Sequence, residues 1–238
     1  LYLNVDENDH RQLFSVDAQG SELRQLTNAA RGVVDFAISP DQKQVIYIEK
    51  TEELEYAFWL MNTDGTENRF VTSCKEAECG QPVWSPDGQR VVYEYMAVNA
   101  DETTIGISSL WWFDIVSGEA KPVFQEDRLP GINPRWSPNG EWLSYATPEG
   151  LRLYHLASGE NRMIKNTLRA AAQWSPDSNS ILLRDVVIKN DQFVTQLFLY
   201  ELSSENLTNL NADENMENIL AAWSPDGRRL TFASRQGG

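Results

Sequence analysis

The sequence predicts an all-β protein built from repeated antiparallel sheets, and three observations lead to this fold class. A motif of an aromatic residue followed by a turn recurs as WSPDG at Trp84, WSPNG at Trp136, WSPDS at Trp174 and WSPDG at Trp223, with a weaker copy, ISPDQ, at Ile38. The mean spacing of about 46 residues matches a four-stranded propeller blade. β-Branched and aromatic runs separated by turn residues follow each copy. We therefore expect a β-propeller of four-stranded antiparallel blades.

The elements of each repeat follow in a fixed order. A short first strand ends in the aromatic residue, and Ser-Pro-Asp-Gly then suits a type I turn in which Pro fixes φ at the second position. The second strand is the apolar run after the turn, such as residues 91–95. A third strand, a second turn rich in Gly, Ser and Asp, and a short fourth strand complete an antiparallel meander. The repeated tryptophans are expected to pack between adjacent sheets, where a large aromatic side chain fixes the spacing.

These residues also carry a resemblance to a known family. PVWSPDG from Pro82 and PRWSPNG from Pro134, with LMNTDGTENRFVT downstream, resemble the WD40-like β-propeller repeat of TolB-type proteins. The resemblance covers essentially the whole chain, and it departs at Ile38, which replaces the aromatic residue, and at Ser178, which replaces the turn glycine. It implies a bacterial origin and an extracytoplasmic location, periplasmic or extracellular, and it fixes no single activity.

The two ends of the chain match incomplete blades. The N-terminal residues match strands two to four of a unit, and the C-terminal residues match strands one and two, on either side of four complete units. The resemblance favours a six-bladed ring, and a five-bladed ring closed by pairing the two ends is the alternative. We expect residues 1–238 to form a single β-propeller domain that is a segment of a longer chain.

Composition excludes several classes of partner. The chain has 35 acidic and 20 basic residues and a net charge of −15, whereas nucleic acids and anionic lipids require clustered Lys and Arg. No apolar run approaches the roughly 18 residues that a membrane span needs. We therefore expect no nucleic-acid partner and no direct membrane insertion.

The two cysteines, Cys74 and Cys79, admit three interpretations. A zinc site is disfavoured, because zinc takes about four ligands and neither histidine lies nearby in the sequence. Two free thiols are the second interpretation. A disulfide is favoured; it would close a short loop, restrain the unfolded chain by about 2 kcal/mol, and indicate an oxidising compartment.

Few residues suggest catalysis. The only histidines are His10 and His155, and no GxSxG motif occurs, so a serine hydrolase of the kind that carries a propeller domain is not expected here. A glycosidase would need two carboxyl groups held about 5–10 Å apart, which a sequence does not reveal. We therefore predict that the chain is not an enzyme.

The acidic charge gathers in the loops that a meander places on one face. These loops, which include residues 73–80 and 185–195 in our assignment, hold 19 acidic and 7 basic side chains. The functional interpretation is a negative surface for a basic or mixed-charge protein or peptide, or a Ca²⁺ site; the alternative is a merely solvated face. The candidate partner-binding residues are Glu49, Glu52, Glu53, Glu55, Asp101, Glu102 and Asp127.

A second candidate site lies on the first strands, just before the repeated aromatic position. Polar side chains there would ring one mouth of a central channel and need hydrogen-bond partners, although a water-filled channel without a ligand is the alternative. These residues are Asp35, Gln81, Asn133, Arg135 and Gln173. Together these features predict a non-catalytic extracytoplasmic scaffold for protein–protein interaction, without a cofactor. The alternatives are a glycan-acting hydrolase or lyase with carboxylates at the channel mouth, and a Ca²⁺ or small-ligand binding module.

Overall fold

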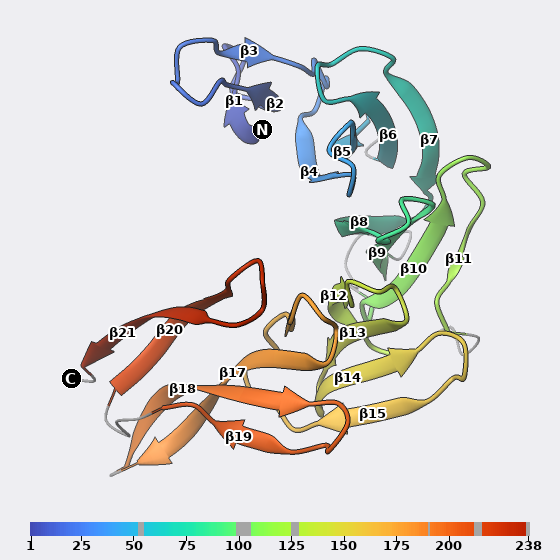
Figure 1. Cartoon of the computed structure of the whole chain (residues 1–238). Helices are drawn as coiled ribbons and strands as arrows, with labels where there is room; N and C mark the ends of the chain where they lie inside the picture. Colours follow the sequence, from blue (N-terminus) through green and yellow to red (C-terminus); the bar gives the residue numbers. More distant parts are fainter. Residues whose placement is uncertain (52–54, 99–105, 125–128, 190, 212–215, 237–238) are drawn as a thin grey trace. The chain divides into compact units, whose positions relative to one another are not determined.

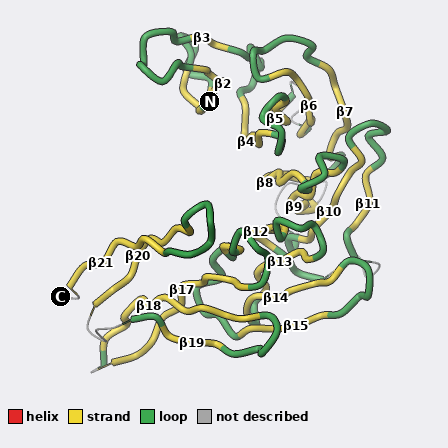
Figure 2. The backbone as a smooth tube through the Cα atoms, viewed as in Figure 1, coloured by secondary structure: helices red, strands yellow, loops and turns green. Residues whose placement is uncertain are grey.

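The structure is a computed structural model that describes residues 1–51, 55–98, 106–124, 129–189, 191–211 and 216–236. Within these residues it contains 21 strands, and the regular structure is β throughout (Figure 1; Figure 2). The chain divides into two compact units, unit 1 at Leu1–Gly131 and unit 2 at Ile132–Gly238.

Unit 1 contains three antiparallel sheets of consecutive strands. They are ordered β1-β2-β3, β4-β5-β6-β7 and β8-β9-β10-β11. The strands are β1 (Tyr2–Val5), β2 (Arg11–Ser15), β3 (Arg24–Gln25), β4 (Val33–Ile38), β5 (Gln44–Lys50), β6 (Tyr56–Asn62), β7 (Arg69–Cys74), β8 (Ala77–Trp84), β9 (Arg90–Ala97), β10 (Ser109–Asp114) and β11 (Ala120–Pro122).

Unit 2 also contains three antiparallel sheets of consecutive strands. They are ordered β12-β13-β14-β15, β16-β17-β18-β19 and β20-β21. The strands are β12 (Ile132–Trp136), β13 (Trp142–Thr147), β14 (Gly150–His155), β15 (Asn161–Ile164), β16 (Gln173–Trp174), β17 (Ser180–Lys189), β18 (Gln192–Glu201), β19 (Leu207–Asn209), β20 (Met216–Trp223) and β21 (Leu230–Gln236).

The prediction of an all-β fold made of four-stranded antiparallel sheets is confirmed. The described residues hold four such sheets, preceded by a three-stranded sheet and followed by a two-stranded one, as the repeat pattern indicated. Each repeated tryptophan ends the first strand of its sheet, as the ranges of β8, β12, β16 and β20 show.

The Ser-Pro-Asp-Gly turn has the same hydrogen bonds in every copy. In the second copy, the amide of Gly88 donates to the Ser85 carbonyl at 2.9 Å. The Ser85 hydroxyl donates to Asp87 Oδ1 at 2.5 Å and accepts from the Arg90 amide at 2.9 Å. The fourth position has a positive φ, and Ser178 adopts it at 63° in place of glycine. The departure from the motif at Ser178 therefore leaves the turn intact.

The second strand β5 is apolar at consecutive positions because both faces of its sheet are buried. In β5, Val45 and Tyr47 pack into a core with Leu13 of the preceding sheet. Ile46 and Ile48, on the opposite face, pack into a second core that includes residues of β8, β9 and β10. Side chains alternate across a strand, so one continuous apolar run supplies two cores.

A cluster of three aromatic rings joins the second and third sheets of unit 1. The ring centroid of Phe58 in β6 lies 4.8 Å from that of Tyr93 in β9 and 5.0 Å from that of Phe113 in β10. The remaining pair, Tyr93 and Phe113, is separated by 5.7 Å. Burial raises the pKa of Tyr93, as expected for a phenol enclosed by apolar side chains.

Two of the predicted loops are wrong. Residues 73–80 were expected to form a loop, but β7 runs to Cys74 and β8 starts at Ala77, so only two residues separate these strands. Residues 185–195 were also expected to form a loop, but β17 and β18 pair from Ser180↔Glu201 to Lys189↔Gln192. The charged and polar residues in this segment concealed a strand extension rich in β-branched side chains.

The aromatic cluster leads to a prediction about stability. Phe58→Ala should lower the free energy of unfolding by about 3–5 kcal/mol, because it removes a fully buried ring and leaves a cavity between two sheets. Phe70→Ala is the matched control, since Phe70 lies in the same sheet and is 52% exposed; it should cost about 1 kcal/mol or less. Chemical denaturation followed by circular dichroism measures both, and equal losses would contradict this packing.

The turn network leads to a prediction about pH. The Ser85 hydroxyl bond holds the pKa of Asp87 below its ordinary value. A lowered folded-state pKa means that this carboxylate stabilises the fold above about pH 4, and that the contribution is lost as the pH falls through the folded-state pKa. Carboxyl NMR titration of Ser85→Ala should show the pKa of Asp87 moving up toward its ordinary value. An unchanged pKa would show that the hydroxyl is not the cause.

Candidate functional site

Four of the five predicted channel-mouth residues, all but Gln173, lie at an irregularity that recurs in the first strands. The pairing register shifts at Val33/Asp35 in β4, Gly80/Val83 in β8, Ile132/Arg135 in β12 and Asn218/Leu220 in β20. Gln81 and Asn133 lie inside these shifts, with φ of 50° and 55°. A bulge takes a residue out of the ladder and redirects its side chain. These positions therefore differ from the regular strand in their backbone conformation, and motif spacing alone did not predict this bulge.

In unit 1, the structure brings Asp35 and Gln81 together. Asp35 Oδ2 accepts from the Gln81 amide at 3.0 Å, and Asp35 Oδ1 accepts from the Phe36 amide at 2.9 Å. β4 and β8 belong to consecutive sheets, so this carboxylate joins the two first strands. The side chain of Gln81 is exposed. Asp35 thus bonds to the backbone of both strands.

In unit 2, Arg135 and Gln173 line one cavity of about 230 Å³, which we call the Arg135 pocket. Arg184 of β17, which the sequence analysis missed, is its third polar residue. Apolar residues line the rest, namely Ala170–Ala172, Leu182, Leu183, Leu197 and Ala221. Asn133, the remaining predicted residue in this unit, instead donates from Nδ2 to the Arg169 carbonyl at 3.0 Å.

The charged residues that line the Arg135 pocket are both arginines. Asp185 follows Arg184 in the sequence, but Asp185 Oδ1 accepts from the amides of Thr167 and Val186, each at 2.8 Å. This oxygen of Asp185 is therefore held by backbone donors. A chain with a net charge of −15 consequently contains a pocket with a positive lining.

Two of the repeated tryptophans bond directly to the first strand of the preceding sheet in the same unit. Trp84 Nε1 donates to the Ala37 carbonyl at 3.1 Å, and Trp223 Nε1 donates to the Gln173 carbonyl at 3.3 Å. The acceptor in both cases is the residue two before the repeated serine. Trp174 reaches the equivalent carbonyl through a second side chain. Its Nε1 donates to Ser144 Oγ at 3.0 Å, and Ser144 Oγ donates to the Arg135 carbonyl. The indoles therefore supply directional bonds as well as packing.

A second hollow, of about 300 Å³, lies in unit 1 and has a different character. Its lining carries both signs of charge, from Arg90 and Lys121 and from Asp114 and Glu119. The guanidinium carbon of Arg90 lies 4.9 Å from the ring centroid of Trp112. Charges of both signs make this hollow a less selective site than the Arg135 pocket.

Most of the predicted partner-binding residues lie outside the described residues. These are Glu52, Glu53, Asp101, Glu102 and Asp127. Glu55 is exposed, and its amide donates to Thr51 Oγ1 at 3.2 Å. Glu49 lies in β5 and is partly buried, and burial raises the pKa of its carboxyl group. The acidic partner surface stays a prediction.

The pair of Ser158 and His155 is part of a turn. The Oγ of Ser158 lies 2.8 Å from Nδ1 of His155, and the Ser158 amide donates to the same nitrogen at 3.2 Å. The equivalent turn after β10 uses Asp114, which accepts from the amide and hydroxyl of Ser117. His155 therefore takes the place of a turn-capping carboxylate, which gives this pair a structural explanation.

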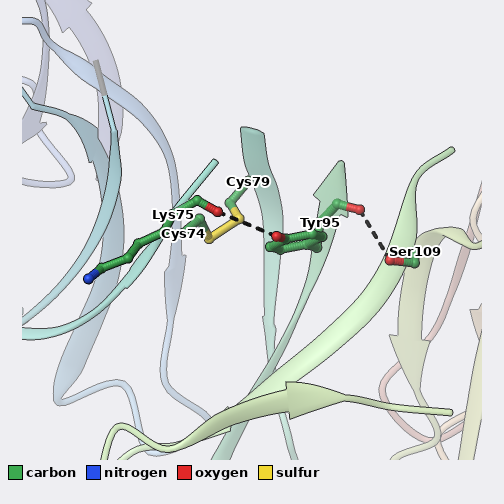
Figure 3. The surroundings of a disulfide bond; sticks show 5 residues. All are labelled: Cys74, Lys75, Cys79, Tyr95 and Ser109. Carbon is green, nitrogen blue, oxygen red and sulfur yellow. Dashed lines mark hydrogen bonds between the residues drawn. A yellow bond between two sulfur atoms is a disulfide. The ribbon is translucent and has the colours of Figure 1, made fainter. Parts of the chain in front are cut away.

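The two cysteines form a disulfide between consecutive sheets. Cys74 ends β7 and Cys79 lies in β8, and both are buried. Figure 3 shows the bond beside Tyr95, whose hydroxyl donates to the Lys75 carbonyl at 3.4 Å. The Ser109 hydroxyl donates to the Tyr95 carbonyl at 3.3 Å on the far side of that strand (Figure 3). The disulfide therefore lies beside two successive hydrogen bonds that involve Tyr95 of the third sheet.

No group of three or more His, Cys, Asp or Glu side chains is arranged to hold a metal ion in the part of the chain that the structure describes. The Ca²⁺ alternative stays a prediction. None of the described residues forms a helix long and apolar enough to cross a membrane.

Comparison with curated proteins identifies peptidases as relatives. The chain is 28% identical to the uncharacterized peptidase YuxL of Bacillus subtilis over 109 residues, which is 43% of this chain and 16% of YuxL. It is 24% identical to dipeptidyl-peptidase 5 of Porphyromonas gingivalis over 226 residues, which is 84% of this chain and 30% of that protein. The chain therefore spans less than a third of either relative. No protein-family model matches the sequence.

Solved structures show the same kind of fold. TolB from Acinetobacter baumannii matches 95% of this chain with 60% of its own, at a TM-score of 0.61 and 19% identity. A puromycin-hydrolyzing peptidase of Mycobacterium tuberculosis matches 98% of this chain with 41% of its own, at 0.69 and 16%. An oligogalacturonate lyase in complex with manganese matches 94% with 64%, at 0.69 and 14%. These similarities support a TolB-like propeller fold.

The relatives overturn two predictions. The non-catalytic interaction scaffold and the statement that the chain is not an enzyme are both wrong, because the curated relatives are peptidases and point to a hydrolytic function. The reason for the error is one of extent. The 238 residues match less than a third of either relative's length, so the lack of a complete catalytic motif among them does not exclude catalysis.

The disulfide leads to a prediction about thiols. The unreduced, denatured protein should titrate with no free thiol and should show two after reduction. Reduction should lower the free energy of unfolding by about 2 kcal/mol, the chain-entropy value for so short a loop. The double variant Cys74→Ser, Cys79→Ser is the control, since a reductant should leave its stability unchanged. Two reactive thiols before reduction would rule out the bond.

Proposed function

We propose that this chain is the β-propeller part of a peptidase and that it binds peptide substrate for hydrolysis. The observation that carries the proposal is the relation to dipeptidyl-peptidase 5, which extends over 84% of the chain. The relation to YuxL, also a peptidase, supports it. The nucleophile would then lie in a part of the protein that corresponds to the unmatched length of these two relatives. A glycan-acting hydrolase or lyase is the second candidate, favoured by the similarity in fold to oligogalacturonate lyase.

The rigid sheets of the propeller part suit it to binding a peptide. Sheets that bury both faces hold their loops and first strands on a rigid core, so little backbone ordering is needed when a peptide binds. The Arg135 pocket, with three polar residues among alanines and leucines, has the composition of a ligand site. Peptide binding at this pocket would limit which substrates are hydrolysed.

Ring closure and location form part of the same proposal. A six-bladed ring, with a five-bladed ring as the alternative, is supported by the similarity in fold to TolB. An extracytoplasmic, oxidising compartment is supported by the disulfide between Cys74 and Cys79.

The test compares two proteins made from the same gene. The complete translated protein is incubated with a mixture of synthetic peptides and with oligogalacturonate, and the products are identified by mass spectrometry. We expect it to cleave peptides and leave the glycan intact, and the 238-residue chain alone is assayed in parallel to locate the nucleophile. Failure of the complete protein to cleave any peptide would reject the peptidase. Equal cleavage by the chain alone would place the nucleophile within these 238 residues.

A further inference from the structure

The three polar residues of the Arg135 pocket have their backbone held in the same way. The backbone carbonyl of each accepts a hydrogen bond from a side chain of another segment. Ser144 Oγ donates to the Arg135 carbonyl at 3.1 Å, and Trp223 Nε1 donates to the Gln173 carbonyl at 3.3 Å. Asn166 Nδ2 donates to the Arg184 carbonyl at 2.7 Å. The backbone at all three positions is therefore fixed from outside the pocket.

The donors are themselves held firmly. Ser144 is fully buried, and its hydroxyl also accepts from Trp174 Nε1 at 3.0 Å. Asn166 is 5% exposed, and the neighbouring Thr167 amide bonds to the Asp185 carboxylate. A binding site whose backbone is positioned by buried partners loses little conformational freedom when a ligand arrives.

The charge of the pocket selects the ligand. Arg135 and Arg184 supply positive charge, and no acidic side chain lines the pocket among the residues that the structure describes. Arg135 Nη1 donates to the Pro134 carbonyl at 2.7 Å, which uses one of the five N–H donors of a guanidinium and steadies its position. The planar arginine fork matches the two oxygens of a carboxylate.

The size of the pocket limits what accompanies the carboxylate. A cavity of about 230 Å³ is smaller than the roughly 300–1,000 Å³ of sites for whole small molecules. Three consecutive alanines, Ala170–Ala172, form part of its apolar lining. This space suits the last residue of a peptide, with its carboxylate against the arginines and its side chain against the alanines.

We propose that the Arg135 pocket binds the free carboxylate at the C-terminus of a peptide. The proposal rests on the proposed function, since it names the part of a peptide substrate that this chain recognises. Gln173, the third polar residue, supplies an amide that can bond to the backbone of the same terminal residue. The neighbouring Asp185 accepts from two backbone amides through Oδ1.

The test measures binding by calorimetry and needs no hydrolysis. The 238-residue chain is titrated with N-acetyl tetra-alanine as the free acid, with the same peptide as its C-terminal amide, and with an amidated peptide ending in glutamate. The free acid should bind about tenfold more tightly than either amide, because only it presents a terminal carboxylate. Equal binding of free acid and amide would overturn the proposal. Equal binding of the free acid and the glutamate amide would overturn the assignment to the terminus.

The variants locate the site. Arg135→Gln and Arg184→Gln should each weaken binding of the free acid about tenfold and leave binding of the amide unchanged. Arg228→Gln is the matched control, since Arg228 is exposed in the last turn of unit 2 and is not among the pocket residues. Thermal unfolding checks that each variant folds. Loss of discrimination in Arg228→Gln, or its retention in both pocket variants, would overturn the proposal.

The two proposals fail in different experiments. A complete protein that cleaves peptides, combined with a chain that binds acid and amide equally, would reject the carboxylate site and leave the peptidase standing. A chain that discriminates acid from amide, combined with a complete protein that cleaves nothing, would reject the peptidase and keep the binding site.

Discussion

Burial of both faces of a sheet is the constraint on which the rest of the structure depends. In β5, alternate side chains enter two separate cores, one shared with Leu13 and the other with Phe58. A sheet packed in this way cannot slide by one residue without exchanging the contents of both cores. The indole bonds from Trp84 and Trp223 add direction, since each ends on a single carbonyl of the preceding sheet. Rigid first strands follow, and these strands carry the polar residues of the candidate site.

The strand order was predictable because its signals are local. A turn serine that donates to Asp87 and accepts from Arg90 encodes its geometry within six residues, and the same six-residue pattern recurs along the chain. The disulfide was also predictable, since Cys74 and Cys79 have few alternatives at that spacing. The extension of β17 and β18 was missed because Asp185, Lys189 and Asp191 have the composition of a loop, whereas pairing across the hairpin decides the structure.

The candidate site was predictable only in part. Arg135 and Gln173 were identified because long polar side chains replace small ones at a repeated position. Arg184 lies on the second strand, where no repeat sets it apart, and only the fold brings it to the same cavity. The bulge that redirects Asn133 depends on pairing between strands, which motif spacing does not encode. Function was misjudged for a different reason: the 238 residues match less than a third of either curated relative, and the indication of hydrolysis came from comparison with these longer proteins.

The disulfide has a consequence for how the chain withstands cleavage. Lys75 and Glu76 are exposed in the short connection between β7 and β8, and the bond spans that connection from Cys74 to Cys79. A backbone cut beside Lys75 would leave the flanking sheets joined through sulfur, with the ring cluster of Phe58, Tyr93 and Phe113 still enclosed between them. The nicked molecule would migrate as one species until a reductant separated its two fragments under denaturing conditions. In surroundings rich in proteolytic enzymes, this bond makes the exposed link between two sheets tolerant of damage.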